Sequence, residues 1–263
     1  MAISFVDIHC HLLPGIDDGA RDWDESLAMA RMAVEDGTTT IIATPHQLGG
    51  FVGNRGDDIR SRVVELQDRL HRAGIPLNVL PGADVRIDAG MLQGLLQGDV
   101  LTLGDHRRHV LLEMPHDLFL PIEQLLDQLA CRKITGILSH PERNEGVLRQ
   151  PEVLARIVES GCLVQITAGS LCGSFGAECQ RLAEVLLDEG LVHFVASDGH
   201  GVRVRRPLLR RAYERIASRI DERAASELCS ENPALVAADR TVPPGRRTPA
   251  SRHRRWRRQK TAA

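Results

Sequence analysis

Short runs of β-branched and aliphatic residues alternate with amphipathic segments along most of this 263-residue chain. The first run begins at Phe5, and six more lie at residues 39–43, 77–80, 110–112, 134–138, 163–166 and 192–196. Between them are helix-like segments, which include residues 24–35, 57–72, 121–131, 151–159 and 176–189. Strands that alternate with helices predict an α/β fold, in which crossover helices connect a parallel sheet. The chain length fits a single domain of this kind, closed into a barrel.

Histidines and acids follow most of these runs, at the point where each predicted strand ends. In a barrel of parallel strands these positions gather at one mouth, so residues far apart in the sequence come together. His9 and His11 are two residues apart on the first strand and therefore share a face. Singly, each side chain has an ordinary interpretation as a surface or hydrogen-bonded residue, but repeated placement at strand ends favours a metal site. The side chains expected to converge are His9, His11, His46, Asp84, Glu113, His140, Asp198 and His200.

The types of these side chains restrict the metal. They are imidazoles and carboxylates without a thiolate, and mixed sites of this kind suit manganese, iron or zinc. Cys10 alternates with the two histidines, so we expect its side chain to point away from the site. Two metal ions about 3.5–4 Å apart can bind a phosphoryl oxygen and lower the pKa of a bridging water. Such a cluster is therefore suited to hydrolysis of a phosphate ester.

Several motifs carry a resemblance to a known family: DIHCHLLPGIDDG, ATPH, PGADV, LLEM, LSHPERN and VASDGH, with ENPALV near the end. Over about residues 3 to 237 the chain resembles hydrolases of the PHP (polymerase and histidinol phosphatase) superfamily. More narrowly, it resembles the CpsB/CapC-type bacterial protein-tyrosine phosphatases of capsule and exopolysaccharide operons. The resemblance implies a PHP-type distorted (β/α)7 barrel, which matches the seven strand-like runs. It also implies manganese as the cofactor, with three Mn²⁺ ions in the site.

The resemblance further implies roles for individual residues. Arg143, in the SHPER motif, and Arg206, before Pro207, match the phosphate-binding arginines, although Arg203 and Arg205 crowd the same loop. The family usually has a bridging glutamate in the third motif, where this chain has the shorter carboxylate of Asp84. The metal ligands carried over by motif are His9, His11, Asp18, His46, Asp84, Glu113, His140, Asp198 and His200.

The implied activity is hydrolysis of phosphotyrosine on a protein by a metal-activated hydroxide. The implied substrate is the phosphorylated tail of a bacterial tyrosine kinase that controls capsule or exopolysaccharide synthesis. A glycine-rich stretch at residues 49–56 and an arginine-rich stretch at 202–206 favour an anionic peptide at the barrel mouth.

Three alternatives stay open. They are a small-molecule phosphatase such as histidinol-phosphatase, a PHP nuclease or nucleic-acid-binding protein, and a non-catalytic regulator, to which Asp84 would point. The sequence specifies neither the kinase partner nor the metal in the cell nor the oligomeric state.

Other catalytic and targeting signals are missing from the sequence. None of the six cysteines begins a Cys-x5-Arg motif, no Gly-x-Ser-x-Gly elbow occurs, and the stretch at 49–56 lacks the Gly-Lys-Ser/Thr of a P-loop. The cysteines form no CxxC pair, which is typical of reduced thiols and predicts a cytoplasmic protein. No apolar run approaches the length of a membrane span, and we expect no signal peptide.

Charge is distributed unevenly along the chain. The 33 basic and 35 acidic residues give a net charge of −2, but residues 240–263 contain nine Lys or Arg and no acid. Residues 1–239 therefore carry a charge of about −11. We expect a barrel phosphatase domain at residues 1–239 and a disordered basic tail at 240–263. The tail would be dispensable, or it would contact polyanions such as anionic lipid, acidic polysaccharide or nucleic acid.

Overall fold

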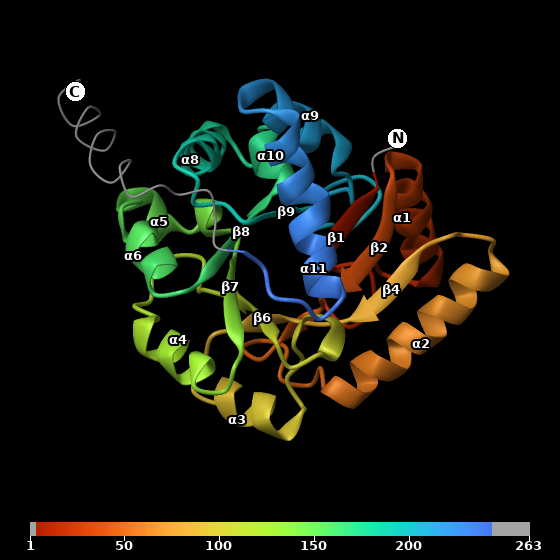
Figure 1. Ribbon diagram of the computed structural model, residues 1–263. Coiled ribbons are helices and arrows are strands. Elements are labelled where there is room, and N and C mark those ends of the chain that lie inside the picture. The colour runs from red at the N-terminus through yellow and green to blue at the C-terminus, as the bar shows by residue number, and fades with distance from the viewer. Residues whose placement is uncertain (1–3, 244–263) are drawn as a thin grey trace.

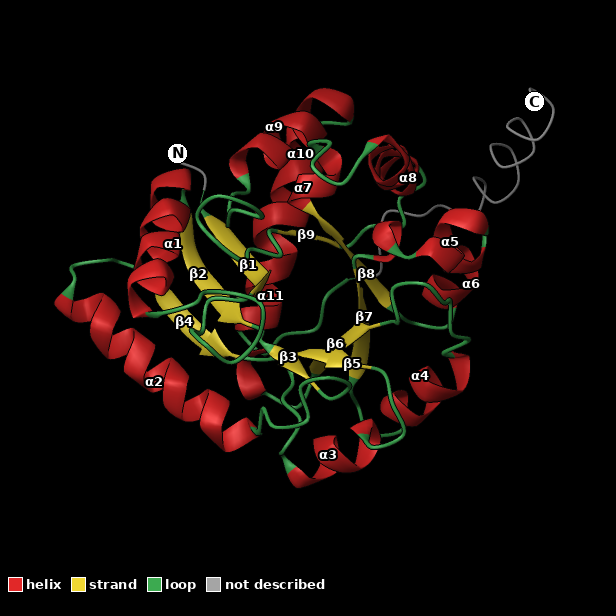
Figure 2. Ribbon diagram, turned by 180° about the vertical axis from the view of Figure 1, so that it is seen from behind, coloured by secondary structure: helices red, strands yellow, loops and turns green. Residues whose placement is uncertain are grey.

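A computed structural model describes residues 4–243, which form one α/β barrel surrounded by helices (Figures 1 and 2). All strand pairings are parallel. One sheet has the order β1 (Phe5–Cys10), β2 (Thr38–Ala43) and β4 (Asn78–Pro81). The other has the order β3 (His46–Gln47), β5 (Asp84–Arg86), β6 (His109–Glu113), β7 (Thr135–Ser139), β8 (Leu163–Thr167) and β9 (Phe194–Ala196).

All seven predicted strands are found in the predicted order, and two further short strands, β3 and β5, follow the second and the third. Thr44 and Pro45 separate β2 from β3, and Gly82 with Ala83 separates β4, which ends at Pro81, from β5. Proline has no N–H to donate and therefore interrupts a ladder. Pairing resumes beyond the breaks, where the Asp84 N–H donates to the Pro45 carbonyl at 3.1 Å. The breaks divide the barrel into two sheets and turn His46 and Asp84 into a short, separate pair of strands.

The barrel closes between its first and last strands. The N–H of Asp198, just after β9, donates to the carbonyl of His9 in β1 at 2.8 Å. The buried carboxylate of Asp7 accepts the N–H of Ser197 at 3.0 Å across the same seam. The seam is therefore held by the residues that flank, or belong to, the predicted metal site.

Helices cover the outside of the barrel, and short ones fill the corners (Figure 2). The five predicted helices are confirmed to within two residues at each end, as α1, α2, α4, α6 and α8. The remaining helices were not predicted from the sequence. The helices are α1 (Trp23–Asp36), α2 (Gly56–Arg72), α3 (Met91–Gln97), α4 (Glu123–Ala130), α5 (Glu145–Arg149), α6 (Val153–Glu159), α7 (Ala168–Leu171), α8 (Ala177–Asp188), α9 (Arg210–Arg219), α10 (Glu222–Ser226) and α11 (Asn232–Ala237), with 3-10 turns η1 (Leu103–Asp105) and η2 (Pro141–Arg143) and a π-helical turn η3 (Glu227–Glu231).

An apolar cluster fills the barrel beneath the predicted site. Leu111 lies on the same face of β6 as Glu113, two residues away, and packs with Ile137 of β7. Val236 of α11 joins this cluster at the end of the barrel that α11 crosses in Figure 1. The cluster separates the predicted site from that end and gives the site an apolar floor.

Packing continues past the predicted boundary between domain and tail. Val242, assigned to the tail, is only 7% exposed and packs into the cluster inside the barrel. The rest of the predicted tail, residues 244–263, lies outside the described residues. Within residues 4–243, no helix is both long enough and apolar enough to cross a bilayer.

The packing of Val242 predicts that two truncations behave differently. Removing residues 244–263 should leave the free energy of unfolding unchanged, whereas removing 240–263 should lower it by about 2 kcal/mol, the contribution of a buried valine-sized side chain. Urea unfolding followed by circular dichroism measures both. Equal stability of the two truncated chains would contradict the assigned packing of Val242.

Candidate metal centre

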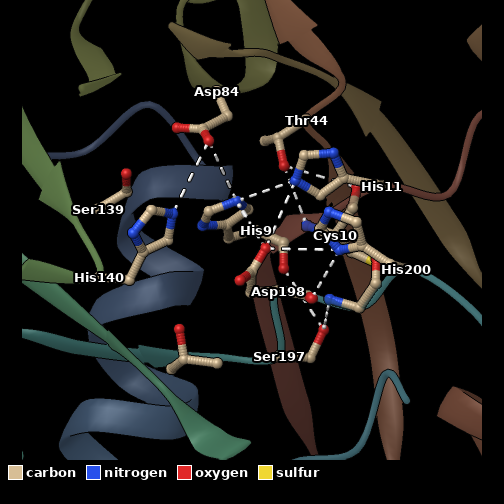
Figure 3. Close-up of polar contacts among 12 residues, drawn as sticks. His9, Cys10, His11, Thr44, Asp84, Ser139, His140, Ser197, Asp198 and His200 are labelled. Carbon is tan, nitrogen blue, oxygen red and sulfur yellow. Dashed lines mark hydrogen bonds and ion pairs between the residues drawn. The ribbon is translucent and has the colours of Figure 1, made fainter. Parts of the chain in front are cut away.

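All nine predicted ligands lie at the mouth formed by the carboxyl ends of the strands. Figure 3 shows six of them, namely His9, His11, Asp84, His140, Asp198 and His200. Most are buried, whereas the Asp18 side chain is 56% exposed at the rim. The side chains come from seven segments of the barrel. They are His9 in β1, His11 and Asp18 after it, His46 in β3, Asp84 in β5, Glu113 in β6, His140 after β7, and Asp198 and His200 after β9.

These residues form four overlapping groups, each with its potential ligand atoms within 4.8 Å of one another. His9, His11, His46 and Asp84 each belong to two groups. Sharing of ligands between neighbouring groups is the arrangement that a multinuclear site requires. The groups are His11, Asp18, His46 and His200; His9, His11 and Asp84; His9, His140 and Asp198; and His46, Asp84 and Glu113.

Asp84 lies between the groups despite its short side chain. Its Oδ2 is 3.6 Å from His9 Nε2, 3.4 Å from His46 Nδ1 and 4.0 Å from His140 Nε2. The side chain is fully buried, and neither oxygen accepts a hydrogen bond from residues 4–243. A buried carboxylate without donors is costly unless a cation neutralises it. The position therefore fits a metal ligand, as do Asp198 Oδ1 and His200 Nε2, which have no hydrogen-bond partner among residues 4–243.

Neighbouring acceptors orient three of the imidazoles. His9 Nδ1 lies 2.9 Å from the side-chain oxygen of Gln165, and His11 Nδ1 lies 2.8 Å from Asp17 Oδ2. His200 Nδ1 lies 2.9 Å from the Asp198 carbonyl. An N–H donated at Nδ1 leaves Nε2 with its lone pair facing the cluster, which is how metal-binding histidines are usually held.

The sequence analysis identified neither Asp17, the neighbour of the predicted ligand Asp18, nor Gln165 as a partner of the histidines. The signal for Gln165 is its place on β8, where strand alternation puts it inside the barrel.

The backbone at the mouth is unusually constrained. His140, Asp198 and Arg205 all have positive φ values, of 32°, 51° and 50°. Residues other than glycine rarely adopt such values, and they persist where the surrounding structure fixes them. Gly19 is required for another reason, because a Cβ there would collide with the His11 carbonyl oxygen.

Burial and the contacts within the cluster shift the pKa values of these groups in different directions. Burial together with the charge of Asp84 raises the pKa of Glu113 to about 7. Burial lowers the pKa of His140 to about 3, with the Arg143 charge adding to the effect. Burial also acts to lower the pKa of His46, but its contacts with Asp18 and Asp84 prevail and raise it to about 11. The cluster can thus hold protons that bound cations would displace.

Two arginines lie at the edge of the cluster. The guanidinium groups of Arg143 and Arg205 both contact Asp198 Oδ2, and the Arg143 group also stacks over Phe175 at 4.3 Å. Arg206, the second predicted phosphate ligand, is exposed instead. The loop turns the neighbouring Arg205 inward, and the sequence analysis did not choose it. Which arginine of the loop points inward depends on the positive φ of Arg205, and no pattern in the sequence reveals this φ value.

The family model described as "Capsular polysaccharide synthesis, CpsB/CapC" matches residues 5–238. The chain belongs to the CpsB/CapC family. Tyrosine-protein phosphatase YwqE from Bacillus subtilis is 42% identical over 202 residues, which are 76% of this chain and 79% of that protein. Tyrosine-protein phosphatase CpsB from Streptococcus pneumoniae is 26% identical over 242 residues, 90% of this chain and all of that protein.

A solved structure agrees with these relationships. It comes from work on YwqE from Bacillus subtilis and CpsB from Streptococcus pneumoniae, described as unique metal-dependent tyrosine phosphatases. It matches with a TM-score of 0.87 and 37% identity, over 92% of this chain and 99% of that one. The predicted family and the predicted barrel fold are therefore confirmed.

The position of Asp84 predicts opposite effects of two substitutions. Asp84→Ala should weaken divalent metal binding at least about tenfold, because even the outer partners of ligands typically contribute 10–100-fold. Asp84→Glu should keep or raise the affinity, because its longer side chain still carries the carboxylate. Calorimetric titration with Mn²⁺ and elemental analysis measure both, and Asp88→Ala, at an exposed acid after β5, is the control. Normal metal content in Asp84→Ala would exclude Asp84 as a ligand.

Proposed function

We propose that this chain is a metal-dependent phosphatase that hydrolyses phosphotyrosine on a protein. The observation that carries the proposal is the set of four overlapping histidine and carboxylate groups with two arginines at their edge. Relatives that share most of the chain are named tyrosine-protein phosphatases, which supports the same activity.

The residues present fit divalent ions. Imidazole and carboxylate donors suit Mn²⁺, and we propose three ions held by the nine predicted ligands, with iron or zinc as possible substitutes. Ions bound there would polarise the phosphate and lower the pKa of a water molecule. Asp17 and Gln165 would keep their histidines in the tautomer that binds metal.

Arg143 and Arg205 are the proposed phosphate ligands. Both guanidinium groups now contact the single oxygen Asp198 Oδ2, and a substrate phosphate offers them further acceptors at the same edge. Stacking on Phe175 limits the movement of Arg143. Arg206, which is exposed, stays a prediction from the sequence.

The cysteines support a mechanism without a thiolate nucleophile. Cys10, Cys162 and Cys229 are buried, and burial raises the pKa of each thiol. A reactive cysteine needs the opposite shift. Cys10 lies between two predicted ligands in sequence, but it packs in the apolar layer outside the site, where its thiol donates to the Gly199 carbonyl.

The remaining details are proposals from the family resemblance. The substrate would be the phosphorylated tail of a tyrosine kinase in capsule or exopolysaccharide synthesis. A cytoplasmic location stays a prediction. Binding of polyanions by the basic tail concerns residues that lie mainly outside the described part of the chain.

A substrate panel tests the function. After chelation and addition of Mn²⁺, the full chain should show a higher kcat/KM on a phosphotyrosine peptide than on histidinol phosphate, and it should not cleave single-stranded DNA. Activity should vanish with the chelator and survive iodoacetamide, because hydrolysis depends on metal rather than thiol. Preferred turnover of histidinol phosphate would reject the tyrosine-phosphatase proposal while leaving the metal site in place.

Substitution of the arginines tests the assignment of phosphate ligands. Arg143→Ala and Arg205→Ala should each lower kcat/KM on the peptide about a hundredfold, the typical effect of removing a donor that stabilises transition-state charge. Metal content should be unchanged. Arg206→Ala, one residue along the same loop, is the matched control and should have a small effect. A larger loss from Arg206→Ala than from Arg205→Ala would restore the assignment made from the sequence.

A further inference from the structure

A groove with a volume of about 950 Å³ begins at Arg143 and runs between the α5–α6 segment and α8. Figure 2 shows these helices side by side on the flank of the barrel opposite α1 and α2. Its apolar lining includes Leu148, Pro151, Phe175, Leu182 and Val185. The volume is at the upper end of the range for ligand pockets, which leaves room for more than a phosphorylated side chain.

The groove is continuous with the candidate metal centre. Arg143 and His116 line both the groove and a smaller hollow that also contains Glu113 and His140. Arg143 thus contacts Asp198 at the cluster on one side and Phe175 in the groove on the other. A phosphate held by Arg143 would therefore lie at the inner end of this groove.

The position of Phe175 is fixed by glycines. Gly173 and Gly176 flank it with φ values of 83° and 89°, which side chains other than glycine rarely adopt. At Gly169 a Cβ would come within 2.9 Å of the Phe175 ring, so a larger residue there would push the ring away. Phe175, which is half-buried, therefore presents an aromatic surface to the groove.

The rim of the groove carries charges of both signs. Glu145 and Arg149 pair with each other at 2.6 Å. Glu178 and Arg181 are exposed on α8, and Arg181 pairs with no acidic side chain among residues 4–243. A nucleic acid or acidic polysaccharide would be bound by a uniformly basic surface. An apolar floor with a mixed rim suits a polypeptide, which offers apolar side chains and peptide groups together.

We propose that this groove binds the polypeptide segment next to the phosphotyrosine, with an apolar side chain of that segment against Phe175. Arg181 is the specificity residue on the rim, where it contacts a carbonyl or acidic group of the same segment. The inference rests on the proposed phosphatase function and adds the part of the protein that distinguishes a peptide from a small phosphate ester.

The test compares a phosphotyrosine peptide with 4-nitrophenyl phosphate, a small aryl phosphate that cannot reach along the groove. Arg181→Glu reverses a charge on the rim, and Val185→Arg fills the groove. Each variant should raise KM for the peptide roughly five- to tenfold. Both should leave kcat/KM for the aryl phosphate unchanged. Arg31→Glu, at an exposed arginine of α1 on the opposite flank, is the control and should change neither substrate.

A change on the peptide makes the test independent of any one variant. Replacing the apolar residue next to phosphotyrosine by glycine should raise KM for the wild-type chain and have little further effect in Val185→Arg, since both remove the same contact. Additive effects, or unchanged peptide KM in Arg181→Glu and Val185→Arg, would overturn the groove proposal. Failure of the metal-loaded wild type to hydrolyse either substrate would instead reject the phosphatase function itself.

Discussion

One fully buried residue, Asp198, connects the closure of the barrel, the ligand cluster and the two arginines at its edge. Its backbone N–H closes the barrel by donating to the His9 carbonyl, and its Oδ1 lies 3.3 Å from His9 Nε2. Its Oδ2 contacts both Arg143 and Arg205. A single residue therefore takes part in barrel closure, in the ligand cluster and in the contacts of both arginines. The φ value of this residue is positive.

Such a cluster of buried charges lowers the stability of the fold unless opposite charges compensate them. Burial costs each ionised group several kcal/mol of solvation free energy. The attraction between opposite charges offsets this cost only where their geometry is good. Compensation within the cluster is uneven: the pKa of His46 is raised to about 11, whereas burial lowers that of His200 to about 4. Divalent cations bound there would supply positive charge and replace protons, which would link metal binding to the stability of the mouth.

The parts of the site that follow from topology were predictable. Strand ends meet at one mouth in any parallel barrel, so His9 and Glu113 could be placed together from the sequence alone. Contacts that depend on local backbone conformation or on distant partners were not predictable. Gln165 resembles any buried strand residue until His9 is placed beside it, and Arg205 differs from its neighbours only through its φ value. Pro45, by contrast, carried a readable signal for the break between β2 and β3, because proline interrupts a ladder.

Two loops at the mouth each turn one side chain toward the ligand cluster. The glycine-rich stretch expected to face a peptide turns Phe51 onto the ring of His46, with centroids 5.1 Å apart, and the arginine-rich stretch turns Arg205 onto the cluster. Each loop thus contributes one side chain that contacts a predicted metal ligand. The groove instead uses α8, whose sequence is that of an ordinary amphipathic helix, and becomes part of the mouth only because Phe175 packs over Arg143. Catalysis and recognition of the polypeptide are therefore assigned to different elements, so substitutions in α8 can change which proteins are accepted while the metal cluster stays the same.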